Sequence, residues 1–190
     1  MVEIENKYKI YNKKFNYVNW IGFWTLYKKE VLRFLIVVIQ TVISPLVTSL
    51  LFLLVLTLAI GNERGEVLGL PFITFLAPGL IAMQIIQQGF SHSSSSIMIG
   101  KIQGNIVDIL YAPMTAGEIT LAINLAACTR SIIIAAVSII VFYFIVELEF
   151  YSFYYIFVST FLGAFILSSI GIIIGLWAEK FDHMASATNF

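Results

Sequence analysis

The chain has 190 residues, of which 59% are hydrophobic and only 12% are charged, and its formal net charge is zero. Because soluble domains carry about 25% charged residues, this composition excludes an ordinary soluble domain and indicates an integral membrane protein. Cys128 is the single cysteine, which excludes an intrachain disulfide and a cluster of thiolate metal ligands.

Four apolar segments are long enough to cross a membrane. A helix needs about 20 apolar residues to span the roughly 30 Å of hydrocarbon in a bilayer. The segments cover about residues 34–60, 71–98, 119–146 and 153–177. We therefore expect an all-α membrane protein, a polytopic helical bundle in which residues 1–33 form a leader and residues 34–190 form the transmembrane domain.

The leader ends in an aromatic and basic stretch. Trp20, Trp24, Tyr27 and Val31 recur there at helical spacing, with two lysines beside them. This pattern suits a helix that lies in the membrane interface, although a belt of aromatic anchors for the first span would have the same pattern. Seven basic residues precede the first span, whereas the loop at 61–69 holds one. Since cytoplasmic segments are enriched in Lys and Arg, the N-terminus is predicted to be cytoplasmic.

The first span contains Pro45, and the second carries a polar stripe. Proline removes a backbone donor and clashes with the carbonyl group four residues earlier, so a kink is expected in the first span. In the second span, polar side chains recur at spacings of four, three and four, which places them on one face of a helix. That stripe either lines a path for a polar or amphipathic substrate or forms hydrogen bonds between helices. Its members are Gln84, Gln88, Ser91 and Ser95.

The segment 101–112 between the second and third spans is predicted to form a short amphipathic helix. Its apolar residues recur at helical spacing, and Pro113 prevents smooth continuation into the next span. Thr115 and Glu118 then have the spacing of a capping box, which predicts a new helix start. An ordinary loop helix would share these features, so a role in transmitting force from a cytoplasmic partner is one of two interpretations.

Arg130 is the one formally charged residue deep within a predicted span. Its insertion at the bilayer centre costs about 2.5 kcal/mol or more, so we expect it to face the bundle interior and to have a partner. The neighbouring spans offer Gln, Ser and Thr but no acid. Polar or carbonyl partners are therefore expected, with either a structural role or a role in substrate passage or gating. The loop that follows this span, with Glu147 and Glu149, is expected on the outer side.

Catalytic and metal-binding patterns are absent from the sequence. Ser91, His92 and Ser93 are adjacent, and neighbouring residues on a helix do not face each other as a nucleophile and its base must. The other histidine, His183, follows the fourth span, so a two-histidine metal site is not expected. The sequence has no G-x-x-x-x-G-K-[ST] motif, so ATP would have to bind to another polypeptide. We expect no enzyme activity, no cofactor and no nucleic acid partner in this chain.

Five features follow one another along the chain in a characteristic order, and they are Tyr27–Arg33, Phe75–Met83, Asn105–Pro113, Arg130 and Glu179–Met184. Together they resemble a known family, the permease subunits of ABC exporters with the type-2 (ABC-2) membrane domain. This group includes drug, lipo-oligosaccharide and polysaccharide exporters. Two stretches are the most specific part of the resemblance. The start of the family's second span is similar to Phe75-Leu-Ala-Pro-Gly-Leu-Ile-Ala-Met83, and its "leu-x-ala-Pro" signature is similar to Leu110-Tyr-Ala-Pro113. Arg130 lies where many members have an arginine in the third span, and the stretches Tyr27–Arg33 and Glu179–Met184 are also similar to the family's.

The resemblance implies a mechanism and a set of partners. Two permease copies would form a homodimer in the cytoplasmic (inner) membrane, and separate ABC ATPase subunits, which bind ATP and Mg, would dock beneath them. Residues 101–112 would be the coupling helix that the ATPase pushes. The implied coupling residues are Ile106, Asp108, Ile109, Leu110, Tyr111, Pro113 and Glu118. The candidate substrate-path residues are a separate hypothesis, which comes from the polar stripe and the buried arginine, and they are Gln84, Gln88, Ser91, Ser95 and Arg130.

Two further expectations follow from the family pattern. The family's membrane domain has six spans and this chain ends where the fifth would begin, so the resemblance implies a C-terminally truncated domain with four of its six helices. The implied function is ATP-driven export of a drug, lipid or glycan-like substrate. The alternative is an ion-coupled secondary transporter or channel, which would typically carry acidic or paired ionisable residues in its spans.

Overall fold

The computed structural model describes residues 18–64, 66–67, 69–146 and 152–180. Three parts of the sequence-based predictions lie outside this range. They are the basic residues before residue 18, the acidic residues at 147 and 149, and the histidine at 183.

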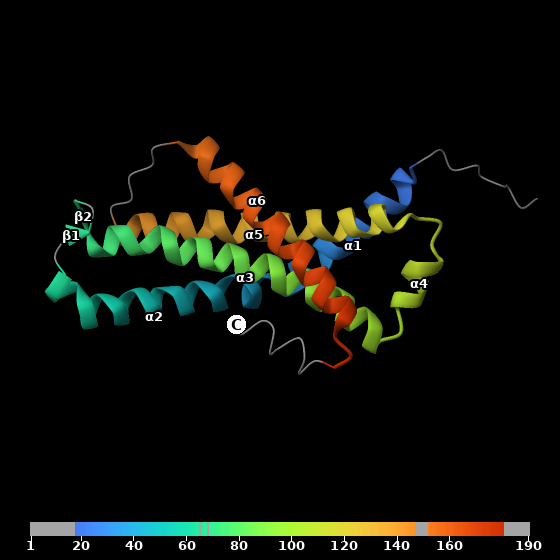
Figure 1. Cartoon of the computed structure of the whole chain (residues 1–190), viewed down its shortest axis with the longest axis horizontal. Helices are drawn as coiled ribbons and strands as arrows, with labels where there is room; N and C mark the ends of the chain where they lie inside the picture. Colours follow the sequence, from blue (N-terminus) through green and yellow to red (C-terminus); the bar gives the residue numbers. More distant parts are fainter. Residues whose placement is uncertain (1–17, 65, 68, 147–151, 181–190) are drawn as a thin grey trace, which may run out of the picture.

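The described chain is a bundle of helices, which confirms the predicted all-α membrane architecture. Four helices are long and apolar enough to cross a membrane, and a shorter helix precedes them. In Figure 1, α2, α3 and α5 run along the long axis of the molecule while α6 crosses them obliquely. Helix α3 is central, because it packs against α2, α5 and α6. The helices are α1 Trp20–Ile36, α2 Val38–Arg64, α3 Phe72–Ile102, α4 Ile106–Tyr111, α5 Ala116–Ile145 and α6 Phe153–Trp177.

A short hairpin joins α2 to α3. Strands β1 (Glu66–Val67) and β2 (Leu70–Pro71) pair antiparallel, with Val67 opposite Leu70. Gly69 in the turn has a φ of 79°, a left-handed conformation that glycine adopts without a steric penalty. The hairpin reverses the chain, so α2 and α3 lie antiparallel and side by side.

The first transmembrane helix begins later than the sequence suggests. We expected the span to start at Phe34, but α1 continues to Ile36 and α2 begins at Val38. Between them Val37 departs from helical geometry, with φ −111° and ψ 27°. The ring of Phe34 is buried against the ring of His92 in α3, with the centroids 6.1 Å apart. This contact fixes the end of α1 against the bundle, so a change of direction is needed before the span can start.

Glycines allow close approach of α3 and α6. A β-carbon built on Gly171 would lie 2.6 Å from the carbonyl oxygen of Phe90, and one built on Gly175 would lie 2.9 Å from that of Ser94. Both distances are too short for any other residue without movement of the backbone. The Gly171-x-x-x-Gly175 motif is therefore a packing surface, as such motifs are in other membrane helices.

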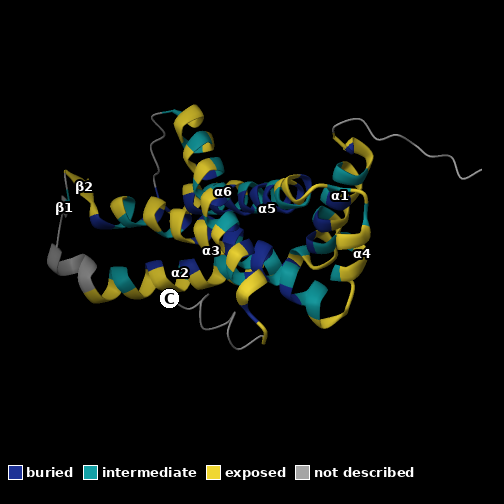
Figure 2. Cartoon of the chain, turned by 45° about the vertical axis from the view of Figure 1, so that its right-hand side comes forward, coloured by how far each residue is buried: buried dark blue, intermediate teal, exposed yellow. Residues whose placement is uncertain are grey.

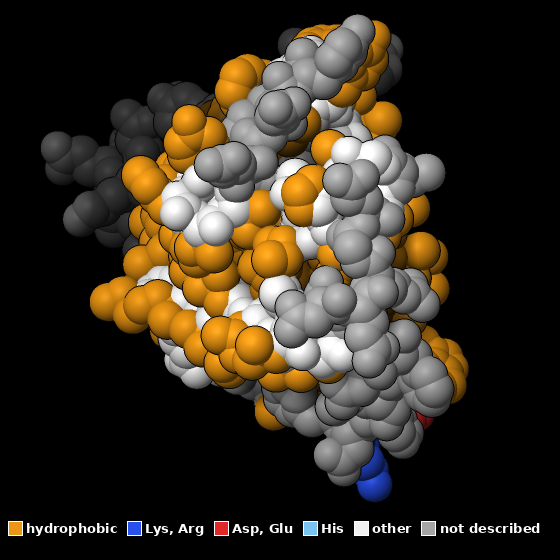
Figure 3. Space-filling model, turned by 90° about the vertical axis from the view of Figure 1, so that its left-hand side faces the viewer, with side chains coloured by type: hydrophobic (Ala, Val, Ile, Leu, Met, Phe, Trp, Pro, Cys, Tyr) orange, Lys and Arg blue, Asp and Glu red, His pale blue; other side chains and the backbone are white. Residues whose placement is uncertain are grey.

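The surface has the character of a membrane domain. Seen from the hairpin end in Figure 3, most of the coloured side chains are hydrophobic and few are charged. Exposed residues recur along α2 in Figure 2, and only 11% of its most apolar 18-residue stretch is buried, against 44% for that of α5. Helix α5 thus lies in the interior of the bundle, whereas α2 presents most of its surface to lipid or to another helix.

Candidate functional site

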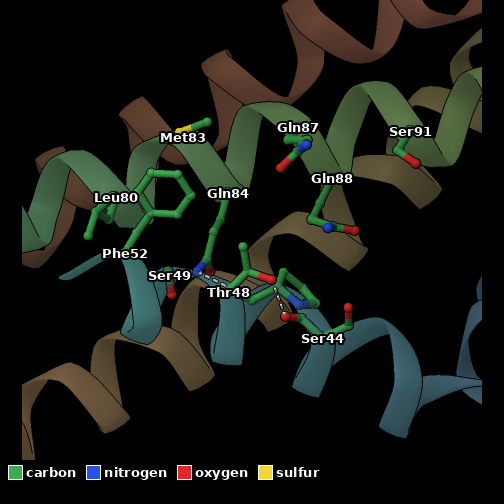
Figure 4. Close-up of a pocket in the computed structure, with 11 residues that line it drawn as sticks. Ser44, Thr48, Ser49, Phe52, Leu80, Met83, Gln84, Gln87, Gln88 and Ser91 are labelled. Carbon is green, nitrogen blue, oxygen red and sulfur yellow. Dashed lines mark hydrogen bonds between the residues drawn. The ribbon is translucent and has the colours of Figure 1, made fainter. Parts of the chain in front are cut away.

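A pocket of about 350 Å³ lies between α2 and α3, within the size range of small-molecule sites. Three of the four residues of the predicted polar stripe line it: Gln84, Gln88 and Ser91 (Figure 4). Ser95 does not, because it lies one turn further along α3 and its hydroxyl group donates to the carbonyl oxygen of His92 at 3.0 Å. The complete lining is Ser44, Pro45, Thr48, Ser49, Phe52, Leu80, Met83, Gln84, Gln87, Gln88 and Ser91.

Gln84 joins three helices at the base of this pocket. Its amide nitrogen donates to the carbonyl oxygen of Pro45 in α2 at 2.9 Å. Its amide oxygen accepts a hydrogen bond from the hydroxyl group of Ser138 in α5 at 2.8 Å. Both ends of the amide are used and the side chain is buried. Of the two interpretations of the stripe, hydrogen bonding between helices therefore describes Gln84.

Arg130 bonds to the next polar residue of the stripe. One terminal nitrogen of its guanidinium group donates to Oε1 of Gln88 at 2.6 Å, and the other lies 3.4 Å from Nδ1 of His92. Arg130 extends from α5 and is not among the residues that line the pocket. The partners of Arg130 are thus an amide oxygen and a ring nitrogen, which agrees with the expectation of polar partners for this residue.

A buried carboxylate lies beside His92, on the side of Arg130 away from Gln88 and the pocket. Glu30 of α1 is only 2% exposed, and its Oε2 accepts a hydrogen bond from Ser96 at 2.8 Å. The same oxygen lies 3.1 Å from the guanidinium group of Arg33 and 3.8 Å from Nε2 of His92. We call Glu30, Arg33, His92, Ser96 and Arg130 the charge cluster.

The charge cluster is not predicted from the sequence, because its acid lies in α1, outside the four predicted spans, in a segment whose pattern suits the membrane interface. One signal was present in the sequence. Leu26, Glu30 and Phe34 recur every four residues, so they share one face of a helix, and that face is the buried one. An acidic residue between two apolar residues on one face points to a buried partner of opposite charge.

Helix α4 occupies the second half of the predicted coupling segment and is shorter than predicted. Lys101 belongs to α3, and Gly104, with a φ of 75°, turns the chain into α4. Asp108 and Leu110 are exposed, and Tyr111 is 86% exposed. Of the other predicted coupling residues, Pro113 is exposed, and Ile106 and Ile109 are half-buried. Helix α4 lies at the end of the molecule opposite the hairpin (Figure 1), so its exposed side chains are available there for contact with a partner.

The predicted capping box is present at the start of α5. Oγ1 of Thr115 accepts from the backbone N–H of Glu118 at 3.3 Å, and Oε2 of Glu118 accepts from that of Thr115 at 2.6 Å. The second carboxylate oxygen of Glu118 accepts from the backbone N–H of Asn19 at 2.6 Å. The Asn19 side chain donates to the carbonyl oxygen of Pro113 at 3.0 Å and caps α1 by accepting from Gly22. One carboxylate therefore fixes the starts of two helices beside α4.

Comparison with known proteins settles the family. Residues 21–190 match the family model described as ABC-2 type transporter. The chain belongs to this family. It is 26% identical over 171 residues to the inner membrane transport permease YadH of Escherichia coli K12, and an equal match is found to the protein of that name in Shigella flexneri. The match covers 90% of this chain and 67% of the relative's length, and no solved structure matches the chain significantly.

Membership of the ABC-2 family confirms the resemblance described above and the identification of the chain as a permease. The family, the inner membrane relative and the four long apolar helices together support the predicted location in the inner membrane. Within the described part of the chain, no group of three His, Cys, Asp or Glu side chains could hold a metal ion. The ring nitrogens of His92 lie beside Glu30 and Arg130, two other members of the charge cluster. Its surroundings in this ABC-2 domain are therefore those of a residue that holds helices together.

Lys101 adds a second connection near α4 in this ABC-2 domain. Its ammonium group donates to the carbonyl oxygens of Leu176 and of Ala178, the latter at 3.0 Å. These carbonyl groups belong to the end of α6, where a helix has unpaired acceptors and a partial negative charge. Lys101, the first residue of the coupling segment, therefore caps the C-terminal end of α6.

Proposed function

We propose that this chain is the permease part of an ATP-driven exporter that moves an amphipathic substrate, such as a drug, lipid or glycan-like compound, across the cytoplasmic membrane. A separate ABC ATPase subunit binds ATP and Mg and supplies the energy. The observation that carries this proposal is the pocket between α2 and α3, which combines amide and hydroxyl groups with Phe52, Leu80 and Met83 inside a bundle of membrane helices. A pocket of this chemistry suits a molecule with a polar and an apolar part.

The ATPase docks on α4 from the cytoplasm and pushes it when ATP binds. Pro113 ends the coupling segment, and the Glu118 carboxylate connects the following turn to both α5 and α1. A displacement of α4 is therefore passed to two helices through short hydrogen bonds, and neither helix has to unwind. A second permease copy completes the pathway, and the exposed surface of α2 supports such pairing.

The test is transport by the full-length permease reconstituted with its ATPase in proteoliposomes. We expect substrate movement to need ATP, to stop when the ATPase carries a substituted Walker A lysine, and to continue when ionophores abolish ion gradients. Transport that persists with the inactive ATPase would contradict the proposal.

One observation favours the alternative of an ion-coupled secondary transporter. The buried Glu30 lies beside His92, and ionisable pairs of this kind carry protons in such proteins. The ionophore arm decides between the two functions, because an ion-coupled transporter would lose activity when the gradient is abolished and the ATPase is intact.

A further inference from the structure

The hydrogen bonds around Arg130 have a fixed direction. A guanidinium group only donates, so the oxygen and not the nitrogen of the Gln88 amide must face Arg130. The NH₂ group of Gln88 is then directed away from Arg130. It has no hydrogen-bond partner among the described residues, and Gln88 lines the pocket. The NH₂ group of Gln88 is therefore an available hydrogen-bond donor at the wall of the pocket.

The same reasoning extends to the charge cluster. Nδ1 of His92 must accept from Arg130, which places the proton of a neutral imidazole ring on Nε2. Nε2 lies 3.8 Å from the carboxylate of Glu30, which is an electrostatic contact and not a hydrogen bond. The guanidinium group of Arg130 thus favours one orientation of both His92 and Gln88.

We propose that Arg130 is a positioning residue that fixes the Gln88 amide with its NH₂ group toward the pocket, which therefore selects an uncharged amphiphile whose polar end carries acceptor oxygens. This inference rests on the proposed function for its assignment of the pocket to the substrate. Arg130 acts through Gln88 and does not touch the substrate itself.

The lining of the pocket supports this substrate class. None of the lining residues carries a formal charge, so an ionic group would lose its hydration without gaining a direct partner of opposite charge. Figure 4 shows Phe52 and Leu80 at one end of the pocket and Ser44 and Ser91 at the other. A ligand would place its hydroxyl-rich end beside Gln88 and its apolar end beside Phe52.

The experiment measures binding of radiolabelled n-dodecyl-β-D-maltoside to the full-length permease in lipid nanodiscs, with empty nanodiscs as background. We expect Arg130→Met and Gln88→Leu each to weaken binding about tenfold, the effect of losing one well-placed hydrogen bond. The double variant should be no weaker than either single variant, because both remove the same donor. Arg130→Lys, which still donates to Gln88, should restore most of the affinity.

A matched control and a second variant keep the test decisive. Ser95→Ala alters the same helix outside the pocket and should bind as the unmodified protein does. Gln88→Glu keeps a partner for Arg130 but removes the NH₂ donor, so it should fold and bind weakly even if Arg130→Met does not fold.

Three outcomes would overturn the inference. They are unchanged binding by Gln88→Glu, additive losses in the double variant, and tighter binding of dodecyl phosphate or dodecyltrimethylammonium than of the maltoside. A failure of ATP-dependent transport with this binding pattern intact would instead contradict the proposed function, so the two failures are distinguishable.

Discussion

Glu30 shows how a single residue can connect a peripheral helix to the interior of this domain. A buried carboxylate is costly unless opposite charge and hydrogen-bond donors surround it. Here Arg33, His92 and Ser96 meet this need, and two of these three belong to α3. The requirement for these partners fixes the position of α1 on the bundle more specifically than its apolar residues could.

Asn19 has a comparable role at the other end of α1, and its removal gives a prediction at the residue scale. Asn19→Ala removes the cap of α1 and the hydrogen bond to Pro113. Loss of a helix cap costs about 1 kcal/mol, so we expect a lower unfolding midpoint and weaker coupling of ATP hydrolysis to transport. Both are measured on the full-length permease assembled with its ATPase.

Thr25→Ala is the matched control, because this exposed threonine lies in the same helix and its side chain donates to the backbone carbonyl group of Ile21, one turn earlier in α1. It should leave both stability and coupling unchanged. Equal effects of the two substitutions would show that the connection at Asn19 carries no special role.

At the scale of the elements, the close packing of α3 and α6 depends on the absence of side chains. Gly175→Leu would place a large side chain where the Ser94 backbone lies. Overpacking of this kind costs about 1–3 kcal/mol, so we expect a clear fall in the thermal midpoint of the purified protein. Gly163→Leu in the same helix is the control, since no atom lies within 4 Å of a β-carbon built there. A midpoint that falls equally in both variants would refute the packing argument.

Helix α4 offers the second prediction at this scale. Asp108→Ala combined with Tyr111→Ala removes an exposed charge and an exposed aromatic ring from the proposed ATPase contact. We expect the ATPase to bind the full-length permease at least about tenfold more weakly, as for residues that dominate an interface. Pull-down titration with purified ATPase measures this change.

Tyr154→Ala serves as the control for α4, because Tyr154 is 70% exposed in the first turn of α6, away from α4. Unchanged ATPase binding by the α4 double variant, or an equal loss in the control, would remove the coupling role from Asp108 and Tyr111.

At the scale of the whole molecule, the features that sequence reasoning predicted are those that local chemistry determines. The capping box at Thr115 and Glu118 and the four long helices depend on residues close in sequence. Three of the four residues of the polar stripe line the pocket, and which of them do so depends on where α2 lies. The partnership of Glu30 with α3 depends on the docking of α1, which brings Glu30 to Ser96, 66 positions away, and no local pattern specifies such a contact.

The orientation of the whole molecule is a remaining prediction, and the chain is well suited to test it. Cys128 is the only cysteine and is 1% exposed, so Cys128→Ala gives a background without a reactive thiol. On this background, Tyr111→Cys and Leu70→Cys each place one thiol at an exposed position, in α4 and in the hairpin. Since basic residues concentrate before the first span, the positive-inside tendency places α4 in the cytoplasm and the hairpin outside. A membrane-impermeant maleimide should therefore label the Leu70→Cys variant in spheroplasts and the Tyr111→Cys variant only in inverted vesicles. The reverse pattern would place α4 on the side without ATP, and an ATPase could then not act on this helix.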